Sequence, residues 1–142
     1  MKRIILISAL AFISIYGHAQ KLNYVSESYF QPMSMGEMIL KAQTEIYWQQ
    51  VMQQKFEEYQ DKAYNCLNNG NYQGFITYSS YALETGWYSS KLYYDRGVVF
   101  EYFHDYRNAK KEYKRAIKSG YYPAQTALEQ CKIHQKEWRK SH

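Results

Sequence analysis

The second half of the chain repeats itself, because residues 56–89 correspond position by position to residues 90–123. When the first stretch is laid over the second, positions of the same chemical character coincide. The coinciding pairs include Tyr59 with Tyr93, Ala63 with Gly97, Tyr72 with Tyr106, Ala82 with Ala116, Gly86 with Gly120, and Tyr88 with Tyr122. A third unit begins in the same register, because Cys131 falls on Gly97. A fixed period of this length, about 34 residues, is typical of an array of helical hairpins, so the sequence predicts an all-α chain.

Residues 1–19 have the pattern of a signal peptide. Two basic residues precede an apolar run over residues 4–16, and the two positions that a signal peptidase reads hold small residues, Gly17 and Ala19. The run is shorter than the roughly 20 apolar residues that a spanning helix needs, so no stable membrane span is expected. We therefore predict cleavage before Gln20 and export of the protein to the periplasm or the extracellular space.

The rest of the chain is charged unequally along its length. Residues 20–106 hold six basic and ten acidic side chains, a formal charge of −4, whereas residues 107–142 hold ten basic and three acidic ones, a formal charge of +7. A basic half attracts anionic surfaces, and the alternative is a set of solvated helix faces. Arginine and aromatic residues do not alternate as expected where bases stack, so no nucleic-acid partner is predicted.

Residues 20–33 lack a helical period and are predicted to form an extended lead-in. Ser34 and Glu37 then have the spacing of a capping box, which predicts the start of a helix. Apolar residues recur at steps of three or four after that point, so residues 35–69 are either one long helix or two helices broken near Gln53. Further helices are predicted over residues 72–84, 90–103, 106–119 and 124–139.

The repeated positions resemble those of the tetratricopeptide repeat (TPR) family. The family's pattern is Trp-x-x-Leu-Gly-x-x-Tyr in a first helix, Ala-x-x-x-Phe in a second helix, and then a proline. The matching residues are Tyr93, Gly97 and Phe100 in the first part and Ala109 and Tyr113 in the second, with Tyr59, Ala63, Phe75 and Ala82 as a looser earlier unit. Two features depart from the pattern. Lys62 and Arg96 stand where the family has leucine, and Pro123 comes two residues late.

The resemblance implies a right-handed array of antiparallel helical hairpins, a TPR-like α-α superhelix. Because each unit buries its apolar face only against its neighbours, we expect the long helix that begins at Met35 to cover the first hairpin and a capping helix to close the C-terminal end. The predicted single TPR-like domain covers residues 34–142. Its parts are repeats at about 56–89 and 90–123 and a capping helix at 124–140.

Small residues predict where paired helices approach each other most closely. Ala63, Gly97 and Cys131 share one register position, and a small residue there lets the second helix of a hairpin approach the first. Cys66 and Cys131 lie in first helices two units apart, which is about 16 to 20 Å when neighbouring helices pack about 8 to 10 Å apart. A disulfide needs Cα atoms within about 7 Å, so two free thiols are expected.

No catalytic or metal-binding pattern survives inspection of the sequence. His104 stands in a predicted turn beside Asp105, and His134, which shares the register of Phe100, is interpreted as a structural histidine. The sequence therefore predicts a protein that is not an enzyme and that has no metal or cofactor site.

The predicted activity is recognition of a protein or peptide partner. The resemblance implies a concave groove lined by the first helices. The residues that step outward from those helices are Tyr64, Tyr94, Asp95, Val98, Tyr102, Lys132 and Lys136. Tyrosines at such positions supply a large contact area at low entropic cost. For Tyr94 and Tyr102 the alternative is ordinary packing between helices.

Two classes of function stay open. The first is a non-enzymatic adaptor or scaffold of the cell envelope or the extracellular space, which binds its partner in the groove. The second is a carbohydrate-binding or peptidoglycan-binding module in which exposed tyrosines stack on sugar rings. The glutamine-rich residues 35–55 are expected to pack on the repeats, or else to form a homo-oligomer through a short coiled coil. The sequence does not identify the partner.

Overall fold

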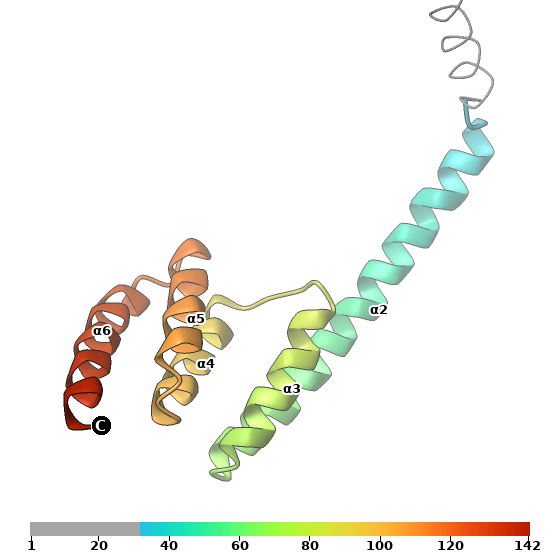
Figure 1. The fold of residues 1–142 in the computed structure, drawn as a ribbon. Helices are drawn as coiled ribbons and strands as arrows, with labels where there is room; N and C mark the ends of the chain where they lie inside the picture. The colour runs from blue at the N-terminus through green and yellow to red at the C-terminus, as the bar shows by residue number, and fades with distance from the viewer. Residues whose placement is uncertain (1–31) are drawn as a thin grey trace, which may run out of the picture. The chain divides into compact units, whose positions relative to one another are not determined.

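The computed structural model describes residues 32–142, and every regular element in that part of the chain is an α-helix. The helices are α2 (Met35–Asn68), α3 (Tyr72–Glu84), α4 (Ser90–Tyr102), α5 (Tyr106–Lys118) and α6 (Pro123–Ser141) (Figure 1). The predicted all-α class is thereby confirmed. The predicted signal peptide, and the predicted lead-in as far as residue 31, lie outside the described residues. None of the helices in residues 32–142 combines the length and the apolar character needed to cross a membrane.

α2 is a single helix of 34 residues, which decides between one helix and two. It begins at the predicted capping box. The Ser34 backbone N–H donates to Glu37 Oε2 at 2.8 Å, and the Glu37 backbone N–H donates to Ser34 Oγ at 3.3 Å. The first of these hydrogen bonds lowers the pKa of the Glu37 carboxyl. The chain divides into two units, residues 1–44 and residues 45–142, and the description below concerns the second unit.

Large apolar side chains of α2 face solvent at the start of this second unit. Ile46, Tyr47 and Trp48 are 53–60% exposed, and full burial along α2 begins only at Phe56. We expected this segment to pack on the repeats, but these three side chains remain mostly exposed. Self-association through residues 35–55 stays a prediction.

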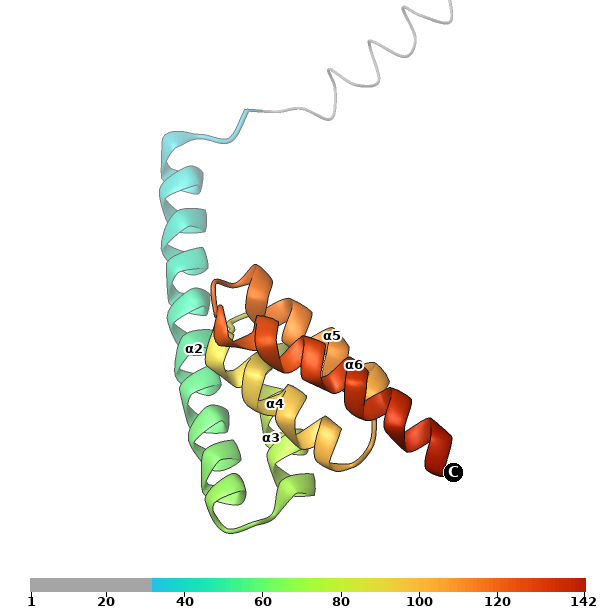
Figure 2. The same cartoon turned by 90° about the vertical axis from the view of Figure 1, so that its left-hand side faces the viewer.

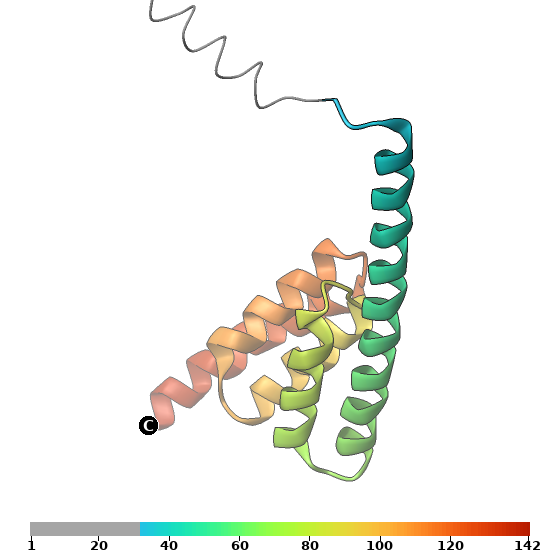
Figure 3. The same cartoon turned by 90° about the vertical axis from the view of Figure 1, so that its right-hand side faces the viewer.

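Two buried clusters hold the helices of this unit together. α3 folds back beside the C-terminal half of α2 (Figure 3), and α5 packs against both α4 and α6 (Figure 2). The first cluster consists of Phe56 and Ala63 of α2, Phe75 and Ala82 of α3, and Leu92 and Val99 of α4. The second consists of Tyr106, Ala109, Tyr113 and Ala116 of α5 and Ala124, Leu128 and Cys131 of α6. The register positions that matched in the sequence thus supply most of the core.

The helix boundaries recur with the period of the sequence. α3 begins at Tyr72 and α5 begins one repeat period later at Tyr106, and both helices have 13 residues. The preceding side chain caps each of them. Asn71 Oδ1 accepts a backbone N–H three residues onward at 2.9 Å, and Asp105 Oδ1 does the same at 3.1 Å. Each cap satisfies an N–H group that has no partner within its own helix.

The turns recur as well. Gly86 and Gly120 follow the second helix of their units with φ of 87° and 90°, a region that glycine enters without steric cost. Gly70 and His104, which also share a register position, have φ of 73° and 58° between the helices of a pair. His104 thus takes the left-handed conformation at a position where the preceding repeat, residues 56–89, has glycine.

α4 and α5 approach each other closely at Gly97 of α4. A Cβ atom placed on Gly97 would lie 2.6 Å from Cε1 of Tyr113 in α5, well inside the contact distance of two carbon atoms. Tyr113 is 2% exposed, so its ring has no space into which to turn. The prediction that Gly97 is the contact point of a helix pair is confirmed.

Cys66 and Cys131 are free thiols, as the repeat spacing predicted. Cys131 occupies the register position of Gly97 and is fully buried in the core beside α5. Burial is the largest cause that raises the pKa of the Cys131 thiol, to about 11.

We predict that Gly97→Leu destabilises the protein by roughly 1 to 3 kcal/mol or more, because the new side chain overlaps the Tyr113 ring in a packed core. Urea unfolding followed by circular dichroism measures the change. Gly36→Leu is the matched control, because nothing lies within 4 Å of a Cβ atom at Gly36. An equal midpoint for Gly97→Leu and the parent protein would contradict the contact.

We also predict that iodoacetamide at pH 8 modifies Cys66 and spares Cys131. Thiolate is the reactive form, and the pKa of Cys131, about 11, leaves little thiolate at that pH. Mass spectrometry of the peptides gives both rates. In guanidinium chloride both thiols should react alike, and equal rates in native buffer would show that the Cys131 site is open.

Candidate functional site

The seven predicted binding residues lie on three helices that correspond to one another in the repeat. We call them the first-helix face: Tyr64 on α2; Tyr94, Asp95, Val98 and Tyr102 on α4; Lys132 and Lys136 on α6. Tyr64, Val98 and Lys132 are equivalent positions of successive units, each one repeat period from the next. These three residues are therefore related to one another by the period of the sequence.

A hydrogen bond joins α2 to α4 on this face. The Tyr64 hydroxyl donates to Asp95 Oδ2 at 2.8 Å, and Lys91 Nζ lies 2.6 Å from the same oxygen. Lys91 Nζ also lies 5.1 Å from the centre of the Tyr64 ring, within the range of a cation–π contact. Burial raises the pKa of Tyr64, and the bond to Asp95 adds to that effect. Tyr64 is therefore a neutral donor that holds two first helices together.

A second polar cluster joins α4, α5 and α6 through Glu101. Its Oε2 atom accepts the Tyr113 hydroxyl at 2.9 Å, and its Oε1 atom lies 2.6 Å from His134 Nδ1. Burial is the main cause that raises the pKa of Tyr113, with the Glu101 bond second. The His134 side chain is 54% exposed. His134 is thus a partner of a carboxylate at the surface rather than a core histidine.

Four of the seven predicted residues are exposed. Val98 is 44% exposed and Tyr102 is 63% exposed, and Lys132 and Lys136 are exposed one helix further on. The Tyr102 ring rests against Tyr72, with ring centres 4.8 Å apart. These four side chains are the part of the first-helix face that is open to solvent.

Tyr94 belongs to the packing rather than to the open surface. It is half-buried, and its ring centre lies 5.8 Å from that of Tyr113 and 5.0 Å from that of Tyr121. Tyr64 and Asp95 are likewise half-buried and bonded to each other. Of the two roles considered for these tyrosines, partner contact and packing between helices, Tyr94 has the packing role. The Tyr102 side chain remains exposed to solvent.

Sequence reasoning missed a buried ion pair between α4 and α5. Arg96 is 7% exposed and Glu112 is 3% exposed, and Arg96 Nε lies 3.8 Å from Glu112 Oε2. Neither of these two atoms has a hydrogen-bond partner within residues 32–142. Burial lowers the pKa of the Arg96 guanidinium, and the Glu112 carboxylate opposes that shift.

Both side chains of this pair also form hydrogen bonds with neighbouring residues. Arg96 Nη1 donates to Ser79 Oγ at 2.6 Å and to Ser80 Oγ at 3.0 Å on α3. Glu112 Oε1 accepts Arg115 Nη1 at 3.0 Å. A signal for the pair was present in the sequence, because Arg96 replaces a leucine of the repeat pattern and Glu112 lies on the same helix face as Ala109 and Ala116.

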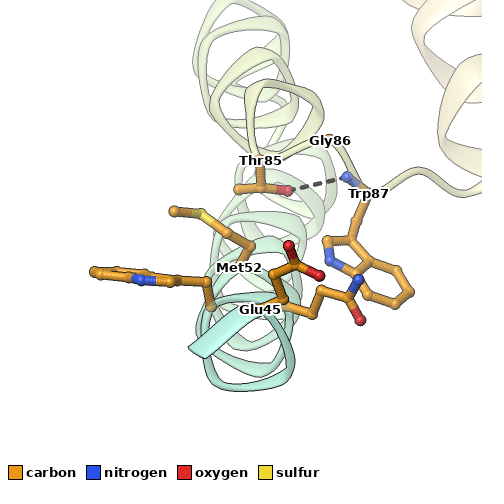
Figure 4. A pocket seen from close by; sticks show the side chains of 7 residues that line it. Glu45, Met52, Thr85, Gly86 and Trp87 are labelled. Atoms are coloured by element: carbon orange, nitrogen blue, oxygen red, sulfur yellow. Dashed lines mark hydrogen bonds between the residues drawn. The ribbon is translucent and has the colours of Figure 1, made fainter. Parts of the chain in front are cut away.

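An open cavity of about 530 Å³ lies between α2 and the loop that follows α3. Its lining residues are Glu45, Trp48, Gln49, Met52, Thr85, Gly86 and Trp87. Figure 4 shows Glu45 and Met52 opposite Trp87, whose backbone N–H donates to Thr85 Oγ1 at 3.3 Å. Sequence reasoning did not select these residues, because they come from two segments that meet only after α2 and α3 have paired.

No three His, Cys, Asp or Glu side chains in residues 32–142 are arranged to hold a metal ion. Comparison of the chain with models of protein families, with curated proteins and with solved structures gives no match. The geometry of the described residues is therefore the basis for any functional assignment.

We predict that Glu112→Gln lowers the free energy of unfolding by on the order of 3 kcal/mol, because it leaves Arg96 as an unpaired buried cation. The double variant Arg96→Leu/Glu112→Gln should lose less than Glu112→Gln alone, since both charges are then absent. Urea unfolding of the three proteins measures the differences.

The control for this experiment is Glu129→Gln. Glu129 pairs with Lys132 at 2.6 Å, but its side chain is 67% exposed, and such a surface pair contributes about 0 to 1 kcal/mol. Equal losses for Glu112→Gln and Glu129→Gln would show that the Arg96–Glu112 pair is not buried in solution.

Proposed function

We propose that this protein is a non-enzymatic, TPR-like interaction module that is exported from the cytoplasm and binds a protein partner across its first-helix face. Two lines of observation support the repeat architecture. Helix starts, side-chain caps and positive-φ turns recur with the period of the sequence, and the small residues of the pattern occupy buried positions in successive first helices. Export rests on the sequence pattern of residues 1–19.

One observation carries the choice of binding surface. Val98 and Tyr102 are exposed apolar and aromatic side chains one turn apart on α4, and Lys132 and Lys136 occupy the equivalent positions on α6. The hydrogen bonds of Tyr64 and Glu101 fix the helices beneath them. A rigid aromatic anchor beside positive charge suits a partner segment with an apolar residue next to acidic ones.

A second candidate function is the binding of carbohydrate or peptidoglycan. It is favoured by Tyr81, Tyr88, Tyr102 and Tyr122, which are 45–72% exposed and so offer ring faces to a sugar. The two candidates differ in the material that the protein binds. Pull-down from envelope extract tests the first, and co-sedimentation with purified peptidoglycan tests the second.

We predict that Tyr102→Ala combined with Val98→Glu weakens capture of the protein partner by more than about tenfold, because aromatic anchors at an interface are typically worth about 2 kcal/mol or more. Quantitative mass spectrometry of the material retained by the full chain and by the variant measures the effect.

The matched control is Lys110→Glu combined with Lys114→Glu, on the second helix α5 and outside the face. This control should retain the partner. If it loses the partner and the Tyr102 and Val98 variant keeps it, binding occurs on the basic surface of α5 and the proposed face is wrong.

A further inference from the structure

A second cavity lies apart from the first-helix face and shares no residue with it. It has a volume of about 360 Å³ and is lined by Tyr88, Tyr93, Arg115, Lys118 and Ser119. Two of these residues come from the loop before α4 and its first turn, and the other three come from the end of α5. The cavity therefore forms where the end of α5 meets the start of α4.

The charged groups of this cavity are all cationic. Arg115 and Lys118 line it and no carboxylate does. The carboxylate that pairs with Arg115 is that of Glu112, whose side chain is 5% exposed and also lies near Arg96. With two guanidinium groups around one buried carboxylate, and Lys118 beside them, the cavity keeps an excess of positive charge. It lies in the half of the chain that carries a formal charge of +7.

The aromatic side chains of the cavity contact each other and Arg115. The Tyr88 and Tyr93 rings are stacked at 6.0 Å with an angle of 25° between their planes. The Arg115 guanidinium carbon lies 5.7 Å from the centre of the Tyr93 ring. Tyr88 is 60% exposed, so one ring of the stack presents a flat surface to the solvent while the other is fixed against Arg115.

Hydrogen-bonding groups remain available at the rim. The Ser119 hydroxyl donates to the Arg115 carbonyl oxygen at 2.9 Å, which leaves its oxygen lone pairs to accept. Arg115 has five N–H donors, of which the structure commits one, to Glu112. Lys118 is exposed and makes no ion pair within residues 32–142.

We propose that this cavity binds the carboxylate-bearing sugar of an anionic saccharide. A flat aromatic face accepts the apolar side of a sugar ring. Arg115 and Lys118 bind the carboxylate, for which a guanidinium offers paired donors. Tyr93 and Ser119 supply partners for hydroxyl groups. A pocket with an aromatic wall and a few converging polar groups is the usual form of a small-ligand site. The site is additional to the protein-binding face and does not depend on it.

Trigalacturonate, titrated into the full chain by isothermal calorimetry at low salt, is the probe for this site. Lys118→Gln should weaken binding by at least about tenfold, since a hydrogen bond to a charged group contributes roughly 1.5 to 3 kcal/mol and about 1.4 kcal/mol is tenfold in affinity. Lys114→Gln is the matched control, because it removes the same charge from the same helix one turn away and outside the cavity. Lys114→Gln should change the affinity less than twofold.

A second pair of variants tests the tyrosine, and the repeat supplies the control residue. Tyr88→Ala should abolish binding, whereas Tyr122→Ala, at the equivalent position of the next unit and 72% exposed, should not. Both side chains are at the surface, and thermal melting by circular dichroism verifies that each variant is folded.

Two further ligands separate a sugar site from general attraction of anions. The fully methyl-esterified trisaccharide should not bind, because it lacks the carboxylates. Hexaglutamate should bind at least about tenfold more weakly than trigalacturonate, because it has no ring to stack on Tyr88. The proposal is overturned if trigalacturonate does not bind, if Lys114→Gln matches Lys118→Gln, if the ester binds equally, or if hexaglutamate binds as tightly.

Discussion

The close approach of α4 and α5 at Gly97 sets the geometry on which the rest of this unit depends. A side chain does not fit at that position without displacing the Tyr113 ring, because a Cβ atom there would lie 2.6 Å from Cε1 of Tyr113. Tyr113 in turn donates its hydroxyl to Glu101, and Glu101 contacts His134 of α6. One tight contact in the core is therefore connected through two polar groups to the neighbouring first helix, and it places the residues of the first-helix face.

The two repeats, residues 56–89 and 90–123, pack their paired helices with side chains of different size at equivalent positions. The positions of Gly97 and Tyr113 are held by Ala63 and Ser79 in the earlier unit. The small Ser79 side chain leaves room for the Arg96 guanidinium, which bonds to its Oγ at 2.6 Å. A charge in this place is costly unless it is paired, and Glu112 supplies the pairing from α5. The departure of Arg96 from the leucine of the TPR pattern thus has a structural partner, and that partner also orients Arg115 at the second cavity.

Periodicity made the helices predictable, whereas contacts between distant segments were not. The spacing of small and aromatic residues located α3 to α6 within one or two residues, and Ser34 with Glu37 marked the start of α2. Gly97 was predictable as a contact point because a small residue recurs there. Arg96 and Glu112 were each recognisable as charged residues at apolar positions, but the sequence did not show that they pair with each other. The cavity beside Trp87 was not predictable, because it joins segments that meet only after packing. For the proposed binding face, the register alone could not separate Tyr94, which packs, from Tyr102, which is exposed.

The central claim is that first helices of successive units lie side by side in sequence order. Asn68, Tyr102 and Lys136 are exposed, share one register position of the repeat, and lie on α2, α4 and α6. Cysteines are introduced at these positions two at a time, in a Cys66→Ser/Cys131→Ala background, and are labelled with nitroxides. Double electron–electron resonance spectroscopy then measures the distance between the two labels of each pair. The repeat predicts narrow distributions, with the 68–102 and 102–136 distances similar and the 68–136 distance clearly longer than either, because neighbouring helices pack about 8 to 10 Å apart. A 68–136 distance as short as the other two would contradict the array.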